Sequence, residues 1–151
     1  MIKIKTHYII LIFMKKFSDA SIQKFLKSLD FSKIEGNLIP VITQDYKSNK
    51  VLMMAFADQE AVIKSLQTGY VHYFSRTRKN LWKKGEQSGH VQEIRKIIVD
   101  CDYDSILYKV KQLGGACHKG YFSCFYNEFI DGKFIIISKK IFQPEDVYTN
   151  Q

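Results

Sequence analysis

The chain has only three cysteines among its 151 residues, and an odd number cannot pair completely into disulfides. Long hydrophobic runs are also missing, because the apolar segment 8–13 is too short to span a bilayer and no small-residue cleavage site follows it. No repeat, low-complexity tract or linker interrupts the sequence. We therefore exclude a disulfide-stabilised secreted scaffold and expect a cytoplasmic protein with reduced thiols and no membrane partner.

The length suits one domain with a sizeable core, and a composition of 46% apolar and 14% aromatic residues is typical of a globular protein. We expect this single domain to cover residues 14–151. Residues 1–13 look like an extension or a mis-assigned start, because Met14 offers a second start. Helix and strand patterns are mixed without βαβ regularity, which favours an α+β fold.

Helix caps and apolar spacing predict two helices. Ser18 or Asp19 can cap the first, and Asp58 can cap a second, which Gly69 would end. Strands are expected over 38–43, 51–56, 70–74, 91–99, 106–110 and 134–138. The first two strands would form a hairpin, with Pro40 at a sheet edge or a bulge because proline has no N–H for the ladder.

The formal net charge of +8 implies an anionic partner such as a phosphorylated metabolite, nucleic acid or a membrane surface. The charge is concentrated between Arg76 and Lys84, where five of nine residues are basic and none is acidic. Trp82, Gly85 and Gly89 lie in or beside this run and can supply a stacking face and close backbone approach. We expect the loop 75–90 to bind phosphate, with a merely solvated loop as the alternative.

Cys101, Cys117 and Cys124 are one ligand short of a closed tetrahedral zinc site. Structural zinc sites normally use four protein ligands, whereas catalytic sites use three and keep one position for water. Cys117 and Cys124 are more widely spaced than a zinc-finger pair, and Cys101 needs the fold or a second subunit to reach them. The trio predicts a catalytic zinc site, and the alternative is three buried free cysteines.

Asp100, Asp102 and Asp104 alternate along the chain around Cys101. In an extended segment the three carboxylates would share one face and Cys101 would point to the other. Carboxylate oxygens are hard donors that suit magnesium better than zinc. We therefore expect a magnesium site beside the zinc site, with a solvated acidic turn as the alternative.

His118 and His90 are the candidate proton carriers, because an imidazole can accept or donate a proton near neutral pH. His118 is the stronger candidate since it adjoins a predicted zinc ligand. Either histidine alone is more often structural than catalytic.

Four stretches, 74–78, 81–90, 100–104 and 117–125, together resemble the phosphoribosyl-AMP cyclohydrolase family of histidine biosynthesis. The resemblance runs from about residue 38 to residue 125, with the motifs in the same order and at similar spacing. It implies hydrolytic opening of the adenine ring of phosphoribosyl-AMP at the N1–C6 bond. It also implies a small, barrel-like mixed sheet with a few short helices.

The resemblance further implies an intertwined homodimer in which Cys101 of one subunit meets Cys117 and Cys124 of the other on zinc. Magnesium would bind the three aspartates. The residues that we expect around the substrate are Ser75, Arg76, Arg78, Trp82, Lys84, Glu86, Ser88 and Gly89. Only 27 residues follow Cys124, too few for the second enzyme domain to which this family is often fused, so we expect the monofunctional form.

Two other functions remain as alternatives. A zinc nucleobase deaminase would also attack a purine C6, but its His-x-Glu and Pro-Cys-x-x-Cys patterns are absent from the sequence. A basic RNA-binding module with a structural zinc would fit the charge and the aromatic residues. The aspartate cluster would repel an RNA backbone, so we expect a small phosphorylated substrate and no nucleic acid.

Overall fold

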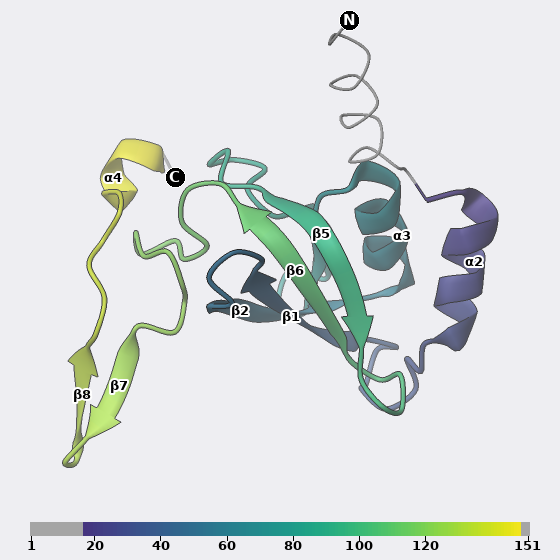
Figure 1. Cartoon of the computed structure of the whole chain (residues 1–151), viewed down its shortest axis with the longest axis horizontal. Coiled ribbons are helices and arrows are strands. Elements are labelled where there is room, and N and C mark those ends of the chain that lie inside the picture. Colours follow the sequence, from purple (N-terminus) through teal and green to yellow (C-terminus); the bar gives the residue numbers. More distant parts are fainter. Residues whose placement is uncertain (1–16, 149–151) are drawn as a thin grey trace, which may run out of the picture.

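Eight strands and three helices form within residues 17–148, the part of the chain that the computed structural model describes (Figure 1). The strands are β1 (Ile39–Asp45), β2 (Val51–Ala57), β3 (His72–Ser75), β4 (Asn80–Lys83), β5 (Gln92–Val99), β6 (Ile106–Gln112), β7 (Asn127–Ile130) and β8 (Lys133–Ile136). The helices are α2 (Asp19–Ser28), α3 (Gln59–Thr68) and α4 (Pro144–Val147). The expected extension 1–13 lies outside the described residues.

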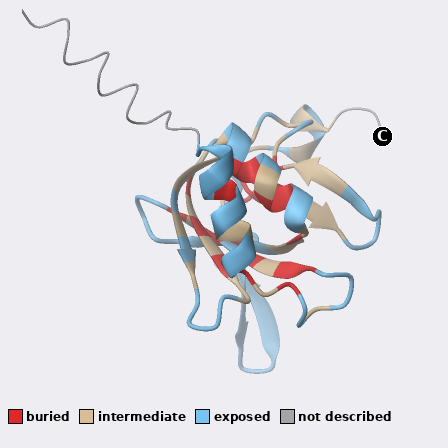
Figure 2. Cartoon of the chain, turned by 90° about the vertical axis from the view of Figure 1, so that its right-hand side faces the viewer, coloured by how far each residue is buried: buried red, intermediate tan, exposed pale blue. Residues whose placement is uncertain are grey.

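Six strands form one curled, mixed sheet in the order β4-β3-β2-β1-β6-β5, and β7 and β8 form a separate hairpin. Helix α3 packs on β2, β3 and β4, and α2 packs on α3. The buried residues gather where these helices meet the sheet (Figure 2). The α+β class is confirmed, with the sheet curled as a half-barrel. No helix within residues 17–148 has the length and apolar character needed to cross a bilayer.

Both predicted helix starts are confirmed. The Ser18 side chain accepts a hydrogen bond from the Ser21 backbone N–H at 3.2 Å, and Asp58 accepts one from the Ala61 N–H at 2.8 Å. Each bond satisfies an N–H that has no partner inside the helix. Gly69 ends α3 with φ of 76°, a left-handed conformation that glycine adopts without steric cost.

Strands β1 and β2 form the expected antiparallel hairpin, but the predicted place of Pro40 is wrong. β1 lies inside the sheet, between β2 and β6. Pro40 is tolerated there because the parallel pairing with β6 begins one residue later, at Val41 opposite Ile106. The irregularity in β1 comes further along, between Thr43 and Gln44.

The sequence analysis predicted one long loop over 75–90. This prediction is wrong, because the segment contains β4, which pairs with β3. Tyr73 and Trp82 lie opposite each other in this pair, with ring centroids 5.1 Å apart. Strand β7 and helix α4 were also not predicted from the sequence. β4 holds the basic segment as a short hairpin, so its side chains project from an ordered frame.

Buried hydrogen bonds join β3, β5 and β6 inside the core. The Tyr73 hydroxyl donates to the Gln92 side-chain oxygen at 2.6 Å, and the Gln92 amide donates to the Gln112 oxygen at 2.9 Å. Tyr73 and Gln92 are fully buried, so each bond satisfies a polar group that water cannot reach. These bonds fix the sheet that carries the basic segment.

Candidate active site

A cavity of about 1070 Å³ lies between the segments 78–88, 116–124 and 140–148. The predicted site residues in its wall are Arg78, Trp82, Lys84, Glu86, Ser88, His118 and Cys124. These segments are separate in the sequence: the first includes β4, the second follows β6, and the third follows the β7–β8 hairpin. The fold therefore brings most of the predicted substrate residues, one predicted metal ligand and one predicted proton carrier to one place.

A second cavity of about 310 Å³ lies on the other side of Arg78 and Trp82, which line both cavities. Ser75 and Arg76 line this smaller cavity and not the larger one. The two cavities together hold all but one of the predicted substrate residues. The exception is Gly89, an exposed residue whose N–H donates to the Gly85 carbonyl at 2.8 Å and so helps to shape the turn.

Local contacts hold the side chains of the smaller cavity. Ser75 ends β3, and its hydroxyl accepts a hydrogen bond from the Arg78 backbone N–H at 3.2 Å. The Arg76 guanidinium lies over the Phe56 ring, 4.0 Å from its centroid. A guanidinium stacked on an aromatic ring keeps its N–H donors directed outward, which suits it to bind phosphate.

Cys117 and Cys124 form a close pair of thiols in the loop after β6. Backbone hydrogen bonds hold both residues: the Cys117 N–H donates to Tyr121 at 3.1 Å, and the Cys124 N–H donates to Leu52 on β2 at 2.7 Å. Cys117 is buried, whereas Cys124 is exposed as a whole residue. Partial enclosure of its thiol, and then the neighbouring Cys117, raise the pKa of Cys124 to about 11. A cation is therefore needed to favour thiolates here.

Lys84 is the cation beside this pair. Only 7% of its surface is exposed, which is unusual for lysine. Burial lowers the pKa of Lys84, while negative charge on Cys124 and Cys117 opposes that shift. We predicted Lys84 as a phosphate ligand from its place in the basic run. It lines the large cavity, so that prediction stays open, and its burial next to two sulfurs makes it a candidate partner for thiolates as well.

Cys101 does not join this pair within one chain. It lies in the turn after β5 and its sulfur is 3.8 Å from the Asp102 carboxylate. Among residues 17–148, the only cluster of three or more potential metal ligands is the aspartate triad. The three sulfurs therefore do not gather around one point in a single chain.

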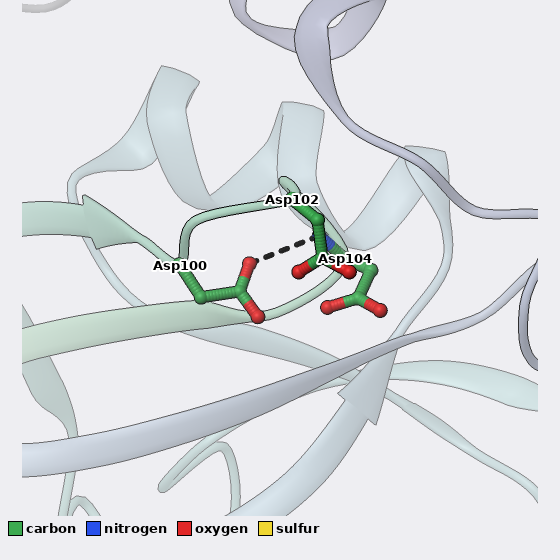
Figure 3. A group of neighbouring side chains, drawn as sticks. All are labelled: Asp100, Asp102 and Asp104. Atoms are coloured by element: carbon green, nitrogen blue, oxygen red, sulfur yellow. Dashed lines mark hydrogen bonds between the residues drawn. The ribbon is translucent and has the colours of Figure 1, made fainter.

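Asp100, Asp102 and Asp104 do come together, with one oxygen of each within 4.8 Å of the others (Figure 3). The predicted extended geometry is wrong, because the segment is a tight turn between β5 and β6. The Asp100 carboxylate accepts the Asp104 N–H at 3.0 Å and the Ser105 hydroxyl at 2.6 Å. The Ser105 bond is the main reason that the pKa of Asp100 falls to about 2. The triad could hold a hard divalent cation.

Lys33 contacts the triad, a contact that no sequence pattern predicted. Its ammonium lies 2.5 Å from an Asp102 oxygen and 2.9 Å from an Asp104 oxygen. The two carboxylates raise the pKa of Lys33. A backbone hydrogen bond of 2.8 Å from Asp30 to Tyr103 ties the segment before Lys33 to the turn. In this conformation a lysine supplies the positive charge that the three carboxylates need.

The two histidines differ in their surroundings. His118 is exposed and lines the large cavity. The His90 ring instead packs edge-on against Phe142 at 4.6 Å and against Gly114, where a Cβ would come within 2.4 Å of the ring. Burial, and then the nearby Lys84 charge, lower the pKa of His90. His118 therefore lies in the wall of the large cavity, whereas the His90 ring packs against Phe142 and Gly114.

The sequence profile of the phosphoribosyl-AMP cyclohydrolase family matches residues 53–126, which include all three cysteines, the triad and the basic segment. The phosphoribosyl-AMP cyclohydrolase of Methanoregula boonei is 56% identical over 114 residues, covering 76% of this chain and 90% of that protein. The phosphoribosyl-AMP cyclohydrolase of Methanosarcina acetivorans is 51% identical over 120 residues, covering 80% and 98%.

A further relative is the histidine biosynthesis bifunctional protein HisIE of Thermoanaerobacter pseudethanolicus, 52% identical over 126 residues. The alignment covers 83% of this chain and 57% of that protein. The relatives support neither the deaminase nor the RNA-binding alternative. The chain belongs to the phosphoribosyl-AMP cyclohydrolase family, hydrolases of histidine biosynthesis.

Proposed function

We propose that the chain hydrolyses the N1–C6 bond of the adenine ring in phosphoribosyl-AMP and releases the formimino-carboxamide ribotide. One observation carries the proposal: the large cavity joins Cys124 and His118 to the basic segment that is suited to hold an anionic substrate. Water would add to C6, and the leaving N1 would need a proton. The cavity wall contains Cys124 as a ligand for a metal that activates water, and His118 as a carrier for the proton. The reduced thiols favour the cytoplasm as its location.

The two cavities suit a substrate with two phosphoribosyl arms. Ser75 and Arg76 would bind one phosphate in the smaller cavity, and Arg78 lies at the border of both cavities. Ser88 and Glu86 would contact the other arm in the larger cavity. Arginine forks bind phosphate oxygens in pairs, so the basic segment fixes the substrate across the border.

Zinc fits the thiol pair by donor chemistry, because neighbouring sulfurs are soft ligands that favour zinc over hard cations. Cys101 of a second subunit would complete the set of three in a homodimer. Zinc bound there would supply Lewis-acid activation of water. Three thiolates carry an excess negative charge, and the Lys84 ammonium would partly offset it. His118 would take the proton from the attacking water at an imidazole nitrogen and return one to N1.

Magnesium fits the triad, since three carboxylate oxygens lie within 4.8 Å of one another in a well-fixed turn. Lys33 would have to leave Asp102 and Asp104 before these oxygens could bind the ion. The triad lies next to Cys101 in sequence. Magnesium would thus fix the turn that delivers Cys101 to the partner subunit.

We expect the purified protein to open the adenine ring of phosphoribosyl-AMP, measured as a change in its ultraviolet spectrum. Zinc chelation and Cys117→Ala should each abolish the change, because either removes the soft site. Zinc content, measured by elemental analysis, should fall together with turnover. Full turnover in Cys117→Ala with unchanged zinc would contradict the zinc assignment, and no spectral change with zinc-loaded protein would contradict the reaction.

We expect subunits that lack different cysteines to complement each other. Cys101→Ala and Cys124→Ala should each be inactive alone, yet co-expression should restore about one quarter of the wild-type sites. Only mixed dimers then pair an intact Cys101 with an intact Cys117–Cys124 pair. A matched control co-expresses Cys117→Ala with Cys124→Ala, whose mutations fall in the same half-site. If both mixtures recovered the same activity, or if neither mixture recovered any, the sites would not be shared between subunits.

We expect His118→Gln to lower kcat by about 10²- to 10⁴-fold, the usual contribution of a proton carrier. Its melting temperature should stay unchanged because the side chain is exposed. His90→Gln should instead lower the melting temperature, since it removes the packing on Phe142 and Gly114. Steady-state kinetics and thermal unfolding of both variants check this. The reverse pattern would make His90 the proton carrier.

We expect Lys33→Met to tighten binding of Mn²⁺, a magnesium substitute, by roughly fivefold, because the ion no longer displaces an ammonium from two carboxylates. Electron paramagnetic resonance of free Mn²⁺ measures the affinity without any assay of turnover. Lys109→Met is the matched control, since Lys109 donates to Asn49 and makes no bond to the triad. An unchanged or weaker affinity in Lys33→Met would show that Lys33 does not compete for the triad.

A further inference from the structure

An apolar row crosses the face of the sheet that the helices leave open. Met54, Ile42, Leu107 and Ile98 lie opposite one another in register on β2, β1, β6 and β5. Three of them expose 38–49% of their surface. Their neighbours along the strands, such as Val41, point to the other face and are buried in the core. We call these four residues the outer row.

The β7–β8 hairpin is a second apolar surface that nothing in residues 17–148 covers. All eight of its strand residues are exposed, and it projects away from the body of the chain (Figures 1 and 2). Phe129 and Phe134 contact each other at 5.2 Å but remain 64% and 73% exposed. An isolated two-stranded hairpin is marginal in water, and contiguous exposed apolar groups mark an interface.

We infer that the hairpin of one subunit packs across the outer row of a second copy of this chain, and reciprocally. This inference rests on the homodimer of the proposed function and names the surfaces that form it. A twofold dimer uses the same patch on both subunits, so each dimer would contain this contact twice. The hairpin would then be an arm exchanged between subunits.

The two surfaces match in size. Four strands at a spacing of about 4.8 Å make the outer row ~14 Å long, and a four-residue strand such as β7 spans ~13 Å. Phe129 and Phe134 could therefore reach along most of the row. Burial of two such rings is worth enough to hold two subunits together when the contact occurs twice.

Charge also favours a second copy as the occupant. Lys96 and Lys109 lie directly opposite each other on β5 and β6, a like-charge pair that destabilises a bare sheet surface. The hairpin carries Glu128 and Asp131 against a single Lys133, in a chain whose net charge is +8. The acidic side chains of the hairpin would therefore offset the basic rim of the row.

The connections to the cysteines support the same arrangement. Cys124 lies three residues before β7 begins, and Cys101 lies two residues after β5 ends. Within one chain the β5–β6 turn and the hairpin lie on opposite sides (Figure 1). A hairpin laid along the outer row would carry the partner's Cys124 toward Cys101. The contact thus has a consequence for the shared site that an unrelated partner would not have.

The test is the association state of a hairpin variant, Phe129→Ser with Phe134→Ser, measured by analytical ultracentrifugation over a range of concentrations. We expect the dimer dissociation constant to rise by more than about a hundredfold, with unchanged circular dichroism because both rings are exposed. Ile98→Asp in the outer row should act in the same way. Phe17→Ser is the matched control, since Phe17 is 47% exposed outside both surfaces.

A mixture of the hairpin variant with Ile98→Asp tests whether the two surfaces bind each other. The hairpin variant keeps an intact outer row and Ile98→Asp keeps an intact hairpin, so the mixed dimer regains one of its two contacts. We expect the mixture to associate more tightly than either variant alone. A wild-type dimer that both variants preserve would overturn this inference and leave the shared site standing. A wild-type chain that stays monomeric while fully active would overturn the shared site as well.

Discussion

The central position of β1 is the constraint on which the site depends. β1 pairs antiparallel with β2 and parallel with β6, so it joins the segment that leads to β3 and β4 with the segment that leads to the cysteine loop. Ser123 and Cys124 then return to β2, where the Ser123 hydroxyl donates to Val51 at 2.7 Å and the Cys124 N–H donates to Leu52 at 2.7 Å. Without this pairing the basic segment and the thiols would share no cavity.

Each predicted metal centre has a lysine beside it. Lys84 lies near two thiols in the cavity wall, and Lys33 bonds two carboxylates of the triad. Neighbouring carboxylates repel, so the triad needs a cation even in the metal-free chain. The thiol pair needs one only when its thiols ionise, because the pKa of Cys124 is raised. The buried Lys84 can stay when a metal binds, because thiolates add negative charge. The exposed Lys33 would have to move, because it uses the same oxygens as the ion.

Sequence patterns predicted the helix starts correctly, because these starts depend on contacts between residues that are close in the sequence. Ser18 and Asp58 cap helices because their side chains bond N–H groups three residues away. Long-range pairing decided the rest. Pro40 sits in an inner strand only because the β6 ladder begins one residue later, and Lys33 meets Asp102 across 69 residues of sequence. Neither the start of a partner strand nor a distant lysine leaves a pattern near the residue concerned.

The net charge of +8 suggested an anionic partner. In the structure, several of the basic side chains lie in separate places, at two cavities, beside the thiols and at the aspartate triad. Arg76 and Arg78 line cavities of a size suited to a small substrate, and Lys84 lines the larger cavity beside two thiols. Lys33 instead bonds carboxylates of this same chain. A nucleic-acid surface would need its cations side by side along a continuous groove. Dispersal among cavities, thiols and carboxylates instead fits an enzyme for a small phosphorylated substrate. These four basic side chains thus lie at cavities and at neighbouring side chains of this chain, and they do not form one continuous basic groove.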